Sequence, residues 1–539
     1  MPTRPGLDTA HDSGAAALDR LLAALREPAR YAHAVERVEL LQTHISCILL
    51  AGDYAYKIKK PVNLGFLDFS TLAARRHYCE EELRLNRRTA PALYLDVIAI
   101  GGSPSAPVIG GGGAPIEYAL RMRRFEQKHL LDRMARRGAL LPAHVDALAR
   151  GVAAFHAQIE RADPSDAYGS PQRILAPALQ NFDQMLPLAS ARTDIALLAR
   201  LRDWAEREYA ALSAEFAVRK RDGWVRECHG DLHLGNIALL DGVPTPFDCI
   251  EFNADFRWTD VINEVAFLMM DLLDHGLSRL AFRFLNAYLE VTGDYGGLRV
   301  LRFYLVYRAL VRAKVSCLRA HQTDLAREDR GEVEHAYRRR LQLAARLSTH
   351  AHAALLIMHG LSGSGKTTVA QSLLEALGAV RLRSDVERKR LFGIAPQARS
   401  DSGLGAGLYA PEANERTYAR LRELARGALA ARYPVIVDAA FLQRAERDRF
   451  AALARDAGAR FVIAACSASP ATLRQRVRAR EHEARDASEA GLAVLDLQMA
   501  RAQAPAPEEA GYTMTIDAER GVAAPEAAAL ARRLGLEPA

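Results

Sequence analysis

A glycine-rich run, GLSGSGKTT, occupies residues 360–368 and offers the clearest chemistry in the sequence. Its spacing satisfies G-x-x-x-x-G-K-[ST], in which glycines let successive backbone N–H groups surround phosphate oxygens. An apolar strand pattern precedes the run and a helical pattern follows it, and the N-terminus of a helix favours anions. We expect Lys366 to reach the β- and γ-phosphates of ATP and Thr367 to bind Mg²⁺. The expected nucleotide contacts are Gly360, Ser362, Gly363, Ser364, Gly365, Lys366, Thr367 and Thr368.

Two aspartates follow apolar strand patterns downstream of this run. Ser384 and Asp385 come directly after VRLR, and Asp438 closes PVIVD. In open parallel sheets the carboxyl ends of the strands collect ligand-contacting residues. Asp385 could therefore orient or deprotonate an acceptor hydroxyl, and Asp438 could bind the metal. The alternative for each is a helix cap or turn aspartate; the pattern favours chemistry for Asp385 and does not decide for Asp438.

Residues 353–510 resemble the small P-loop kinases of the gluconate kinase, zeta toxin and polynucleotide 5′-kinase group. The resemblance rests on GLSGSGKTT, the Asp385-x-x-Arg388 pair, VIVDAAFL and TLRQRVRARE. It implies that Asp385 is the acceptor base and that Arg388 contacts a phosphate of the acceptor. It also implies that Arg476 or Arg480 is a lid residue over the transferring phosphoryl group, although arginines fill that helix and many face solvent.

A second run, HGDLHLGNIALLDGVPTPFDCIEFN, brings His229, Asp231, Asn236 and Asp248 close together in sequence. Phosphoryl transfer needs a base beside the acceptor hydroxyl and oxygen ligands for Mg²⁺. Asp231 could supply the base, and Asn236 with Asp248 could bind the metal. The spacing matches a protein-kinase-like catalytic loop. His229 is expected to brace the loop.

This second run resembles the aminoglycoside phosphotransferase and choline kinase-like family. The whole chain resembles bacterial two-domain proteins in which such a domain precedes an ATP-binding domain. The resemblance implies a bilobed kinase-like fold in which Lys57 contacts the α- and β-phosphates and Glu82 pairs with it. Alternation places Lys59 on the same strand face as Lys57, so the pattern alone does not choose between them. Glu81 is the neighbouring alternative to Glu82.

Two departures from the family pattern leave a degenerate, regulatory N-terminal domain as an alternative. No glycine-rich loop precedes Lys57, and Cys249 and Ile250 follow Asp248 where the family has glycine. Asp260 and Asp271 are expected to cap or pack a helix and are left out of the site.

Several kinds of element must position these residues. Short strand patterns with one helix near 72–89 predict a small, mostly β lobe, and the segment from Gly101 predicts a hairpin loop. From 126 to 345 the pattern is helical, except for 229–252. Strands and helices alternate after Ala353, which predicts a parallel α/β sheet. The expected fold class is thus an α+β bilobed kinase-like domain at 21–345, after a disordered segment at 1–20, followed by an α/β P-loop domain at 353–539.

Composition sets the cellular and chemical context. The chain has 539 residues, 50% of them apolar, and a formal charge of +7 with nearly balanced signs. Phosphate-bearing substrates explain this charge as well as nucleic acid does. The six cysteines form no metal-ligand spacing and are expected to be reduced and buried. With no apolar leader or membrane span, we expect a cytoplasmic protein with no membrane association.

The sequence therefore predicts a bifunctional ATP-dependent phosphotransferase that uses Mg²⁺ and acts on small hydroxylated acceptors. One alternative is a regulatory protein in which one domain senses a nucleotide or metabolite and gates the other. Another is a nucleic-acid 5′-end kinase, which is disfavoured but not excluded, because aromatic residues do not alternate with the basic ones. No motif marks an obligate protein partner, and neither acceptor is identified.

Overall fold

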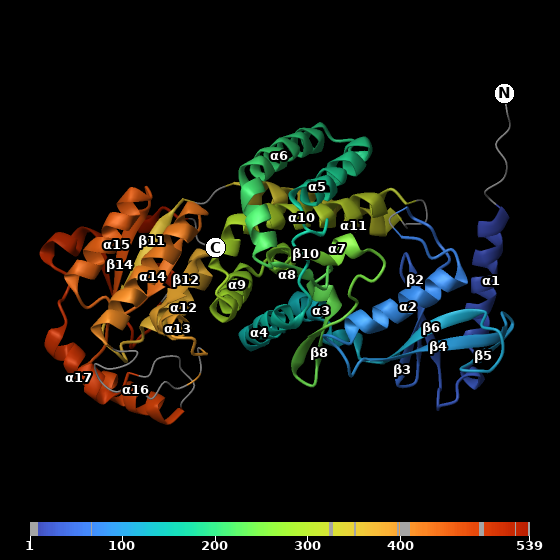
Figure 1. The fold of residues 1–539 in the computed structure, drawn as a ribbon, viewed down its shortest axis with the longest axis horizontal. Coiled ribbons are helices and arrows are strands. Elements are labelled where there is room, and N and C mark those ends of the chain that lie inside the picture. Colours follow the sequence, from blue (N-terminus) through green and yellow to red (C-terminus); the bar gives the residue numbers. More distant parts are fainter. Residues whose placement is uncertain are drawn as a thin grey trace. The chain divides into compact units, whose positions relative to one another are not determined.

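The computed structural model describes residues 9–65, 67–322, 327–349, 352–395, 398, 410–483, 490–522 and 524–536. The chain forms two compact units, and each is described by itself (Figure 1). The first comprises Met1–His144, Ala154–Arg173 and Val218–Glu264. The second comprises Val145–Ala153, Ile174–Ala217 and Val265–Ala539.

The first unit contains an antiparallel sheet of six strands in the order β1-β2-β3-β6-β4-β5. Helix α2 (Leu72–Asn86) begins where the hydroxyl of Thr71 accepts a hydrogen bond from the backbone N–H of Ala74. This arrangement matches the small β lobe expected from the strand patterns. The strands are β1 (Val38–Gln42), β2 (Ser46–Ala51), β3 (Tyr54–Lys59), β4 (Tyr94–Ser103), β5 (Ala106–Ile109) and β6 (Glu117–Arg123).

The expectation of disorder at the N-terminus is wrong for residues 9–20. Helix α1 spans Thr9–Leu25, and Leu18, Leu21, Leu22 and Leu25 are buried with residues of the sheet. Spacings of three and four residues place these leucines on one helix face, so burying them stabilises the helix. Residues 1–8 lie outside the described residues.

The segment from Gly101 differs in detail from a plain loop. Strand β4 continues to Ser103 and pairs antiparallel with β5, which lies inside this glycine-rich stretch. The segment is therefore a short β-hairpin that extends the sheet at its edge.

The rest of the first unit carries the second sequence run on short elements, and the middle of helix α4, Val145–Ala153, belongs to the second unit. Strand β7 pairs antiparallel with β10, and β8 pairs antiparallel with β9. The β7–β10 ribbon flanks the run from His229 to Phe252, and the β8–β9 ribbon lies within it. Their bounds are β7 (Val225–Glu227), β8 (Ile237–Leu240), β9 (Val243–Pro246) and β10 (Trp258–Asp260), with helices α3 (Leu131–Arg136), α4 (Pro142–Gln158) and α7 (Ala254–Arg257).

The second unit begins with long helices. Helix α8 is buried over most of its length, and α10 packs extensively against α11. The helices are α5 (Pro171–Met185), α6 (Arg192–Arg221), α8 (Val261–Asp274), α9 (Ser278–Thr292), α10 (Leu298–Ala320) and α11 (Arg327–Ser348).

A parallel sheet of five strands in the order β12-β13-β11-β14-β15 completes the second unit. The last of its strands was not anticipated from the sequence. The strands are β11 (Ala354–His359), β12 (Val380–Arg383), β13 (Val435–Asp438), β14 (Arg460–Ser467) and β15 (Thr513–Asp517). The helices are α12 (Lys366–Leu377), α13 (Ser384–Leu391), α14 (Pro411–Ala430), α15 (Arg444–Asp456), α16 (Pro470–Glu483), α17 (Leu492–Arg501) and α18 (Ala524–Leu534).

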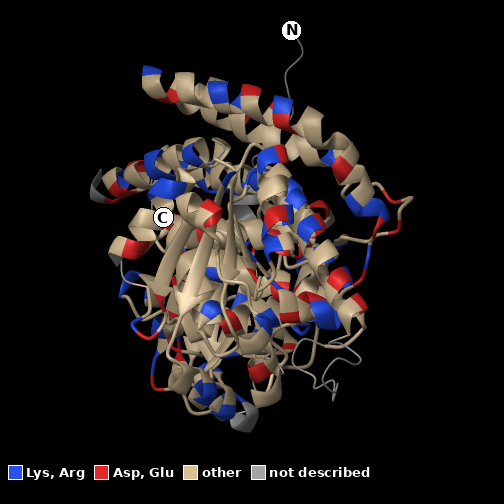
Figure 2. Cartoon of the chain, turned by 90° about the vertical axis from the view of Figure 1, so that its left-hand side faces the viewer, with Lys and Arg blue, Asp and Glu red and all other residues tan. Residues whose placement is uncertain are grey.

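Apolar side chains of β11, β13 and β14 pack against α12 and α18 in one core cluster. Figure 2 shows basic and acidic residues interspersed on the helices around these strands. The expected order, an antiparallel lobe and helices followed by a parallel sheet, is confirmed. Among the described residues, we find no helix with the length and apolar character needed to cross a membrane.

We predict that Leu22→Ala destabilises the N-terminal lobe by about 2–5 kcal/mol, because it removes buried methyl groups and leaves a cavity. Arg20 lies on the exposed side of the same helix, so Arg20→Ala should change stability by no more than about 0.5 kcal/mol. Urea unfolding of the full-length chain, followed by hydrogen exchange in peptides of β1–β3, measures both. Equal effects of the two variants would show that α1 does not belong to the core.

Candidate active sites

The glycine-rich run forms a tight loop between β11 and α12. Gly360, Gly363 and Gly365 have φ values of +147°, +80° and +81°. A Cβ atom at Gly360 would lie 2.6 Å from the carbonyl oxygen of Cys466, and one at Gly363 would lie 2.7 Å from that of Leu473. Glycine is therefore required at these two positions both by backbone conformation and by space.

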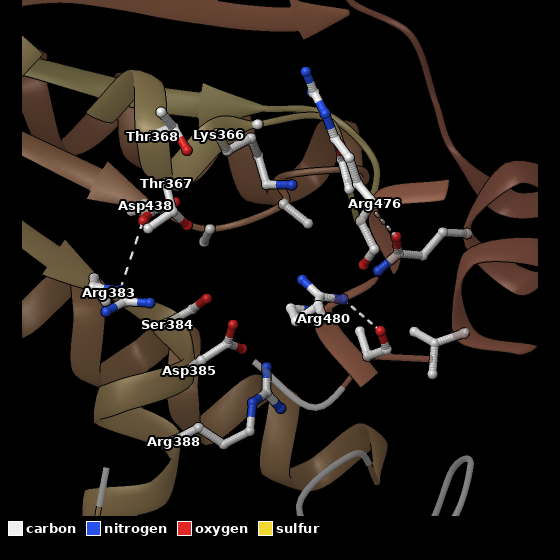
Figure 3. A pocket seen from close by; sticks show the side chains of 18 of the residues that line it. Lys366, Thr367, Thr368, Arg383, Ser384, Asp385, Arg388, Asp438, Arg476 and Arg480 are labelled. Atoms are coloured by element: carbon white, nitrogen blue, oxygen red, sulfur yellow. Dashed lines mark hydrogen bonds and ion pairs between the residues drawn. The ribbon is translucent and has the colours of Figure 1, made fainter. Parts of the chain in front are cut away.

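Strand ends bring the carboxylates to this loop. Strands β12 and β13 are parallel neighbours in which Arg383 pairs with Asp438, and Ser384 and Asp385 open α13 directly afterwards. A cavity of about 300 Å³ lies between the loop and these strand ends (Figure 3). Of the residues predicted for this site, those lining the cavity are Ser362, Gly363, Gly365, Lys366, Thr367, Thr368, Asp385, Arg388, Asp438, Arg476 and Arg480. Gly360 and Ser364 shape the loop without lining the cavity.

The electrostatics of the cavity are set by burial. The amine of Lys366 donates to the carbonyl oxygen of Leu361 at 2.8 Å, and burial lowers the pKa of Lys366. Burial raises the pKa of Asp438, while nearby arginines act in the opposite direction. One buried carboxylate oxygen of Asp438 has no hydrogen-bond partner, and a hydrogen bond links the side chain to Thr367. A buried carboxylate beside a hydroxyl is an oxygen donor set that fits Mg²⁺.

Arginines approach the cavity from two sides. Arg388 donates to the side-chain oxygen of Asn414 at 3.1 Å. Arg476, from α16, donates to the carbonyl oxygen of Ala518 at 3.1 Å, and Arg480 lies on the same helix. Figure 3 shows Asp385 and Arg388 below the loop with Arg480 opposite them, whereas the Arg476 side chain runs upward, away from this pair. The cavity is thus lined by more basic than acidic groups, which suits anionic ligands.

Sequence reasoning missed four polar residues that line this cavity, namely Arg383, Asn414, Tyr418 and Gln498. Gln498, on α17, accepts a hydrogen bond from the backbone N–H of Ser362 at 2.8 Å. Asn414 and Gln498 lie far from the loop in sequence and belong to no motif. Arg383 directly precedes Ser384 and Asp385, so its position at the strand end was a usable signal.

In the first unit, buried ion pairs connect β3, α2 and the segment after β9. The amine of Lys57 lies 2.7 Å from Glu82 and 2.5 Å from Asp248. Lys59 lies 2.8 Å from the second oxygen of Glu82 and also pairs with Glu251. Burial alone would raise the pKa of Glu82, but the two lysines outweigh it and lower that pKa.

These contacts distinguish Lys57 from Lys59 and Glu82 from Glu81 by their partners, while the phosphate-binding role of Lys57 stays a prediction. Lys57, rather than Lys59, is the lysine beside Asp248. Glu81 pairs instead with Arg84 and Arg257, so Glu82 alone of the two glutamates contacts the lysines.

The second sequence run folds into a loop in which its polar residues meet. The side-chain amide of Asn236 donates to the carboxylate of Asp231 at 2.9 Å. The backbone N–H of Phe247 donates to the carbonyl oxygen of Asn236 at 2.9 Å. Asp248 directly follows Phe247, so this hydrogen bond brings Asp248 near the Asp231–Asn236 pair. His229 is buried and donates to the carbonyl oxygen of Phe247 at 2.9 Å.

The backbone of Asp248 has a left-handed conformation, with φ of +65°. Its N–H donates to the hydroxyl of Tyr94 at 3.0 Å, and the N–H of Cys249 donates to the side-chain oxygen of Asn86 at 2.9 Å. Side-chain acceptors on β4 and α2 therefore hold this segment, where the related family pattern has a glycine.

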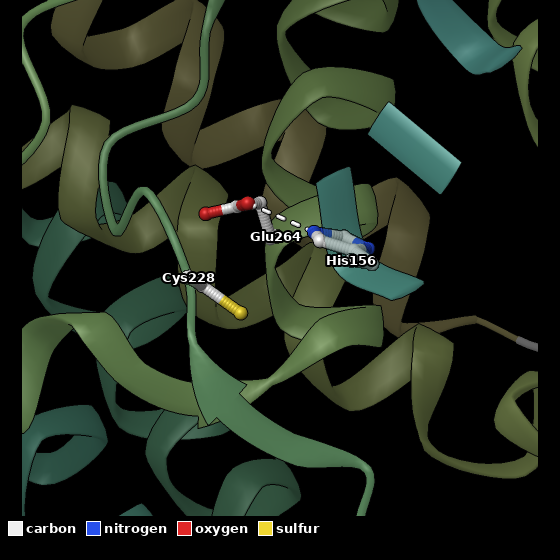
Figure 4. Close-up of side chains that lie close together, drawn as sticks. All are labelled: His156, Cys228 and Glu264. Carbon is white, nitrogen blue, oxygen red and sulfur yellow. Dashed lines mark hydrogen bonds and ion pairs between the residues drawn. The ribbon is translucent and has the colours of Figure 1, made fainter. Parts of the chain in front are cut away.

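A fully buried cluster of His156, Cys228 and Glu264 lies behind the loop, with their ligand-type atoms within 4.8 Å of one another (Figure 4). One oxygen of Glu264 lies 2.9 Å from the imidazole of His156, and the other accepts from the backbone N–H of Gly230 at 2.8 Å. Burial raises the pKa of the Cys228 thiol, which disfavours the thiolate that a metal requires. The geometry therefore fits a hydrogen-bond chain that holds Gly230, the neighbour of Asp231.

Comparisons with known proteins divide the chain between residues 304 and 355, so the first family match includes helices of the second compact unit. Residues 78–304 match the family model described as "Phosphotransferase enzyme family", and residues 355–505 match the model described as "AAA domain". An uncharacterized protein of Mycobacterium tuberculosis (strain H37Rv) and one of Mycobacterium bovis are each 31% identical over 445 residues. These alignments cover 82% of this chain and 86% of each relative.

Two solved structures are similar over part of the chain. Amicoumacin kinase, in complex with AMP-PNP, Ca²⁺ and Ami, is 13% identical with a TM-score of 0.40, covering 62% of this chain and 96% of that one. A gluconokinase from Sinorhizobium meliloti is 22% identical with a TM-score of 0.25, covering 34% of this chain and 95% of that one.

We predict that Gly363→Ala weakens nucleotide binding at the glycine-rich loop by at least about tenfold, or about 1.4 kcal/mol. The new methyl group would meet the carbonyl oxygen of Leu473 at a positive φ. Gly427 lies inside α14 with no atom within 4 Å of an added Cβ, so Gly427→Ala should leave binding unchanged. Titration with a fluorescent ADP analogue measures both, and unweakened binding in Gly363→Ala would contradict the loop geometry.

We also predict that Glu264→Ala speeds hydrogen exchange in the peptide 228–236 by roughly ten- to a hundredfold. The change removes the charged acceptor of the Gly230 N–H, and a hydrogen bond to a charged group contributes about 1.5–3 kcal/mol. Glu264→Gln keeps an acceptor oxygen and should show a smaller increase. Exchange mass spectrometry of the full-length chain provides the measurement, with β-lobe peptides as the internal reference. If the 228–236 peptide exchanges at the wild-type rate, Glu264 does not hold the loop.

Proposed function

This chain belongs to the family of its mycobacterial relatives and carries a phosphotransferase domain followed by an AAA-type P-loop domain, and we propose that both domains transfer phosphoryl groups. The protein is an ATP-dependent kinase. In the proposal, each domain moves the γ-phosphoryl group of ATP to the hydroxyl of a separate small molecule. The observation that carries it for the P-loop domain is the meeting of Lys366, Asp385 and Asp438 around one cavity, and the buried Lys57–Glu82 pair beside Asp248 supports it for the N-terminal domain.

In the P-loop domain, backbone N–H groups of the loop and Lys366 bind the phosphates of ATP. Thr367 and Asp438 would hold Mg²⁺, which when bound neutralises charge on the phosphate oxygens. Asp385 accepts the proton of the acceptor hydroxyl as that oxygen attacks the γ-phosphorus, and the bond from the γ-phosphorus to the bridging oxygen breaks to release ADP. Arg388 orients the acceptor, and Arg476 and Arg480 stabilise the negative charge on the transferring group.

In the N-terminal domain, Lys57 binds the α- and β-phosphates and is directed by Glu82. Asn236 and Asp248 would hold Mg²⁺ through oxygen ligands. Asp231 accepts the proton of the acceptor hydroxyl. Its carboxylate also accepts a hydrogen bond from Asn236, which links the base to a residue proposed to bind the metal.

One observation favours a second candidate for the N-terminal domain, a nucleotide sensor without transfer. Asp248 is engaged by Lys57 at 2.5 Å, and its backbone adopts a positive φ without glycine in the next position. A carboxylate committed to the lysine is less available to a metal. In that case the P-loop domain alone would turn over substrate.

The proposed acceptors are small molecules, and the proposed location is the cytoplasm. A cavity of about 300 Å³ suits a small alcohol. The six cysteines are buried free thiols, which supports a reducing compartment. Basic and acidic residues are interspersed on the helices in Figure 2, which gives less support to a nucleic-acid end kinase.

We predict that Asp231→Ala and Lys366→Ala remove different products from a metabolite extract incubated with the protein and ATP. Asp231→Ala removes the N-terminal base, and Lys366→Ala removes the phosphate contact of the P-loop. Mass spectrometry should show one species, heavier by one phosphoryl group, lost in each variant. If Asp231→Ala loses no product, the N-terminal domain is a sensor; if Lys366→Ala loses none, the P-loop assignment fails.

A further inference from the structure

Within the second unit, helix α9 lies along the edge strand of the parallel sheet. The side-chain amide of Asn286 donates to the carbonyl oxygen of Ala379 at 2.8 Å, and its oxygen accepts from the backbone N–H of Arg381 at 2.6 Å. Strand β12 is an edge strand of the sheet, so backbone groups on its outer side have no neighbouring strand to bind. Asn286 thus fixes α9 to β12 through two backbone contacts.

One turn further along α9, Glu290 faces two arginines of β12. Its carboxylate lies 2.9 Å from Arg381 and 3.5 Å from Arg383. These arginines are two positions apart, so they point to the same side of the strand. The carbonyl oxygen of Glu290 also accepts a hydrogen bond from Arg390 of α13 at 2.6 Å. Glu290 is therefore held by the strand end and by the helix that begins with Ser384 and Asp385.

Arg383 has a second carboxylate on its other side. Its guanidinium lies 3.9 Å from the Asp438 oxygen that has no hydrogen-bond partner, as the dashed line in Figure 3 shows. Arg383 and Asp438 both line the cavity beside the glycine-rich loop. The guanidinium is thus shared between Glu290, outside the cavity, and the carboxylate proposed to bind the metal.

We propose that Glu290 is a positioning residue that holds Arg383 back from Asp438 and so keeps this carboxylate available to Mg²⁺. The inference rests on the proposed P-loop site. A guanidinium and a divalent cation compete for the same carboxylate, because both bind through its oxygens. When Glu290 loses its charge, Arg383 moves toward Asp438 and opposes metal binding. Helix α9, which lies outside the P-loop sheet, therefore controls how the sheet's site takes up its metal.

The test measures binding rather than turnover. Full-length protein is titrated with a fluorescent ADP analogue at increasing Mg²⁺ concentration, and the signal lost in Lys366→Ala is assigned to the P-loop. We expect Glu290→Gln to raise the Mg²⁺ concentration for half-maximal binding by about fivefold, the size expected for one partly buried charge pair. In the double variant Glu290→Gln/Arg383→Ala, the Mg²⁺ concentration for half-maximal binding should return to within about twofold of the wild-type value.

Glu375 provides the matched control. It lies on α12 and pairs with Arg283 of α9 at 2.8 Å, with a side chain as buried as that of Glu290. Glu375→Gln removes an ion pair to the same helix without touching Arg383, so the Mg²⁺ dependence should stay that of the wild type. An unchanged Glu290→Gln, an equal change in Glu375→Gln, or no rescue by Arg383→Ala would overturn the proposal. If the wild type shows no Lys366-dependent binding, the proposed function itself is wrong.

Discussion

The N-terminal site depends on the buried ion pairs that the carboxylate of Glu82 makes with two lysines. A carboxylate removed from water must be paired, and Glu82 uses both oxygens, one for Lys57 and one for Lys59. Lys57 continues to Asp248 and Lys59 to Glu251. One side chain of α2 therefore sets the positions of the strand β3 lysines and of the segment that carries the proposed metal ligand. Removing Glu82 would leave two buried ammonium groups, each with only one carboxylate.

The same constraint shapes the second site. Asp438 is buried at the end of β13, which raises its pKa, and the β12 arginines and Lys366 offset this effect in part. Those arginines are themselves anchored by Glu290 of α9. In both units, a series of ion-paired side chains of alternating charge links the surrounding helices and strands to the site. Rigid placement of such charges is what phosphoryl transfer requires, because its catalysis consists mainly of positioning and electrostatic stabilisation.

Much of this could be predicted from the sequence, because motif spacing and strand ends have local causes. The glycine-rich loop, Asp385 and Asp438 follow from short patterns around parallel strands, and the structure places them around one cavity. Lys57 could not be separated from Lys59 by alternation, since the choice depends on Asp248, far along the chain. Glu290, Glu251, Glu264 and Gln498 act through tertiary contacts that leave no local pattern. Helix α1 was missed because its N-terminal residues are small and polar, and its leucines become informative only against the sheet.

The central claim is that one chain holds two nucleotide sites, and the stoichiometry of nucleotide binding tests it most directly. Isothermal titration of the full-length protein with a non-hydrolysable ATP analogue and Mg²⁺ should give two nucleotides per chain. One should be lost in Lys366→Ala, the other in Lys57→Met, and both in the double variant. A wild-type value of one, lost entirely in Lys366→Ala, would contradict the account and leave the N-terminal domain without a nucleotide site.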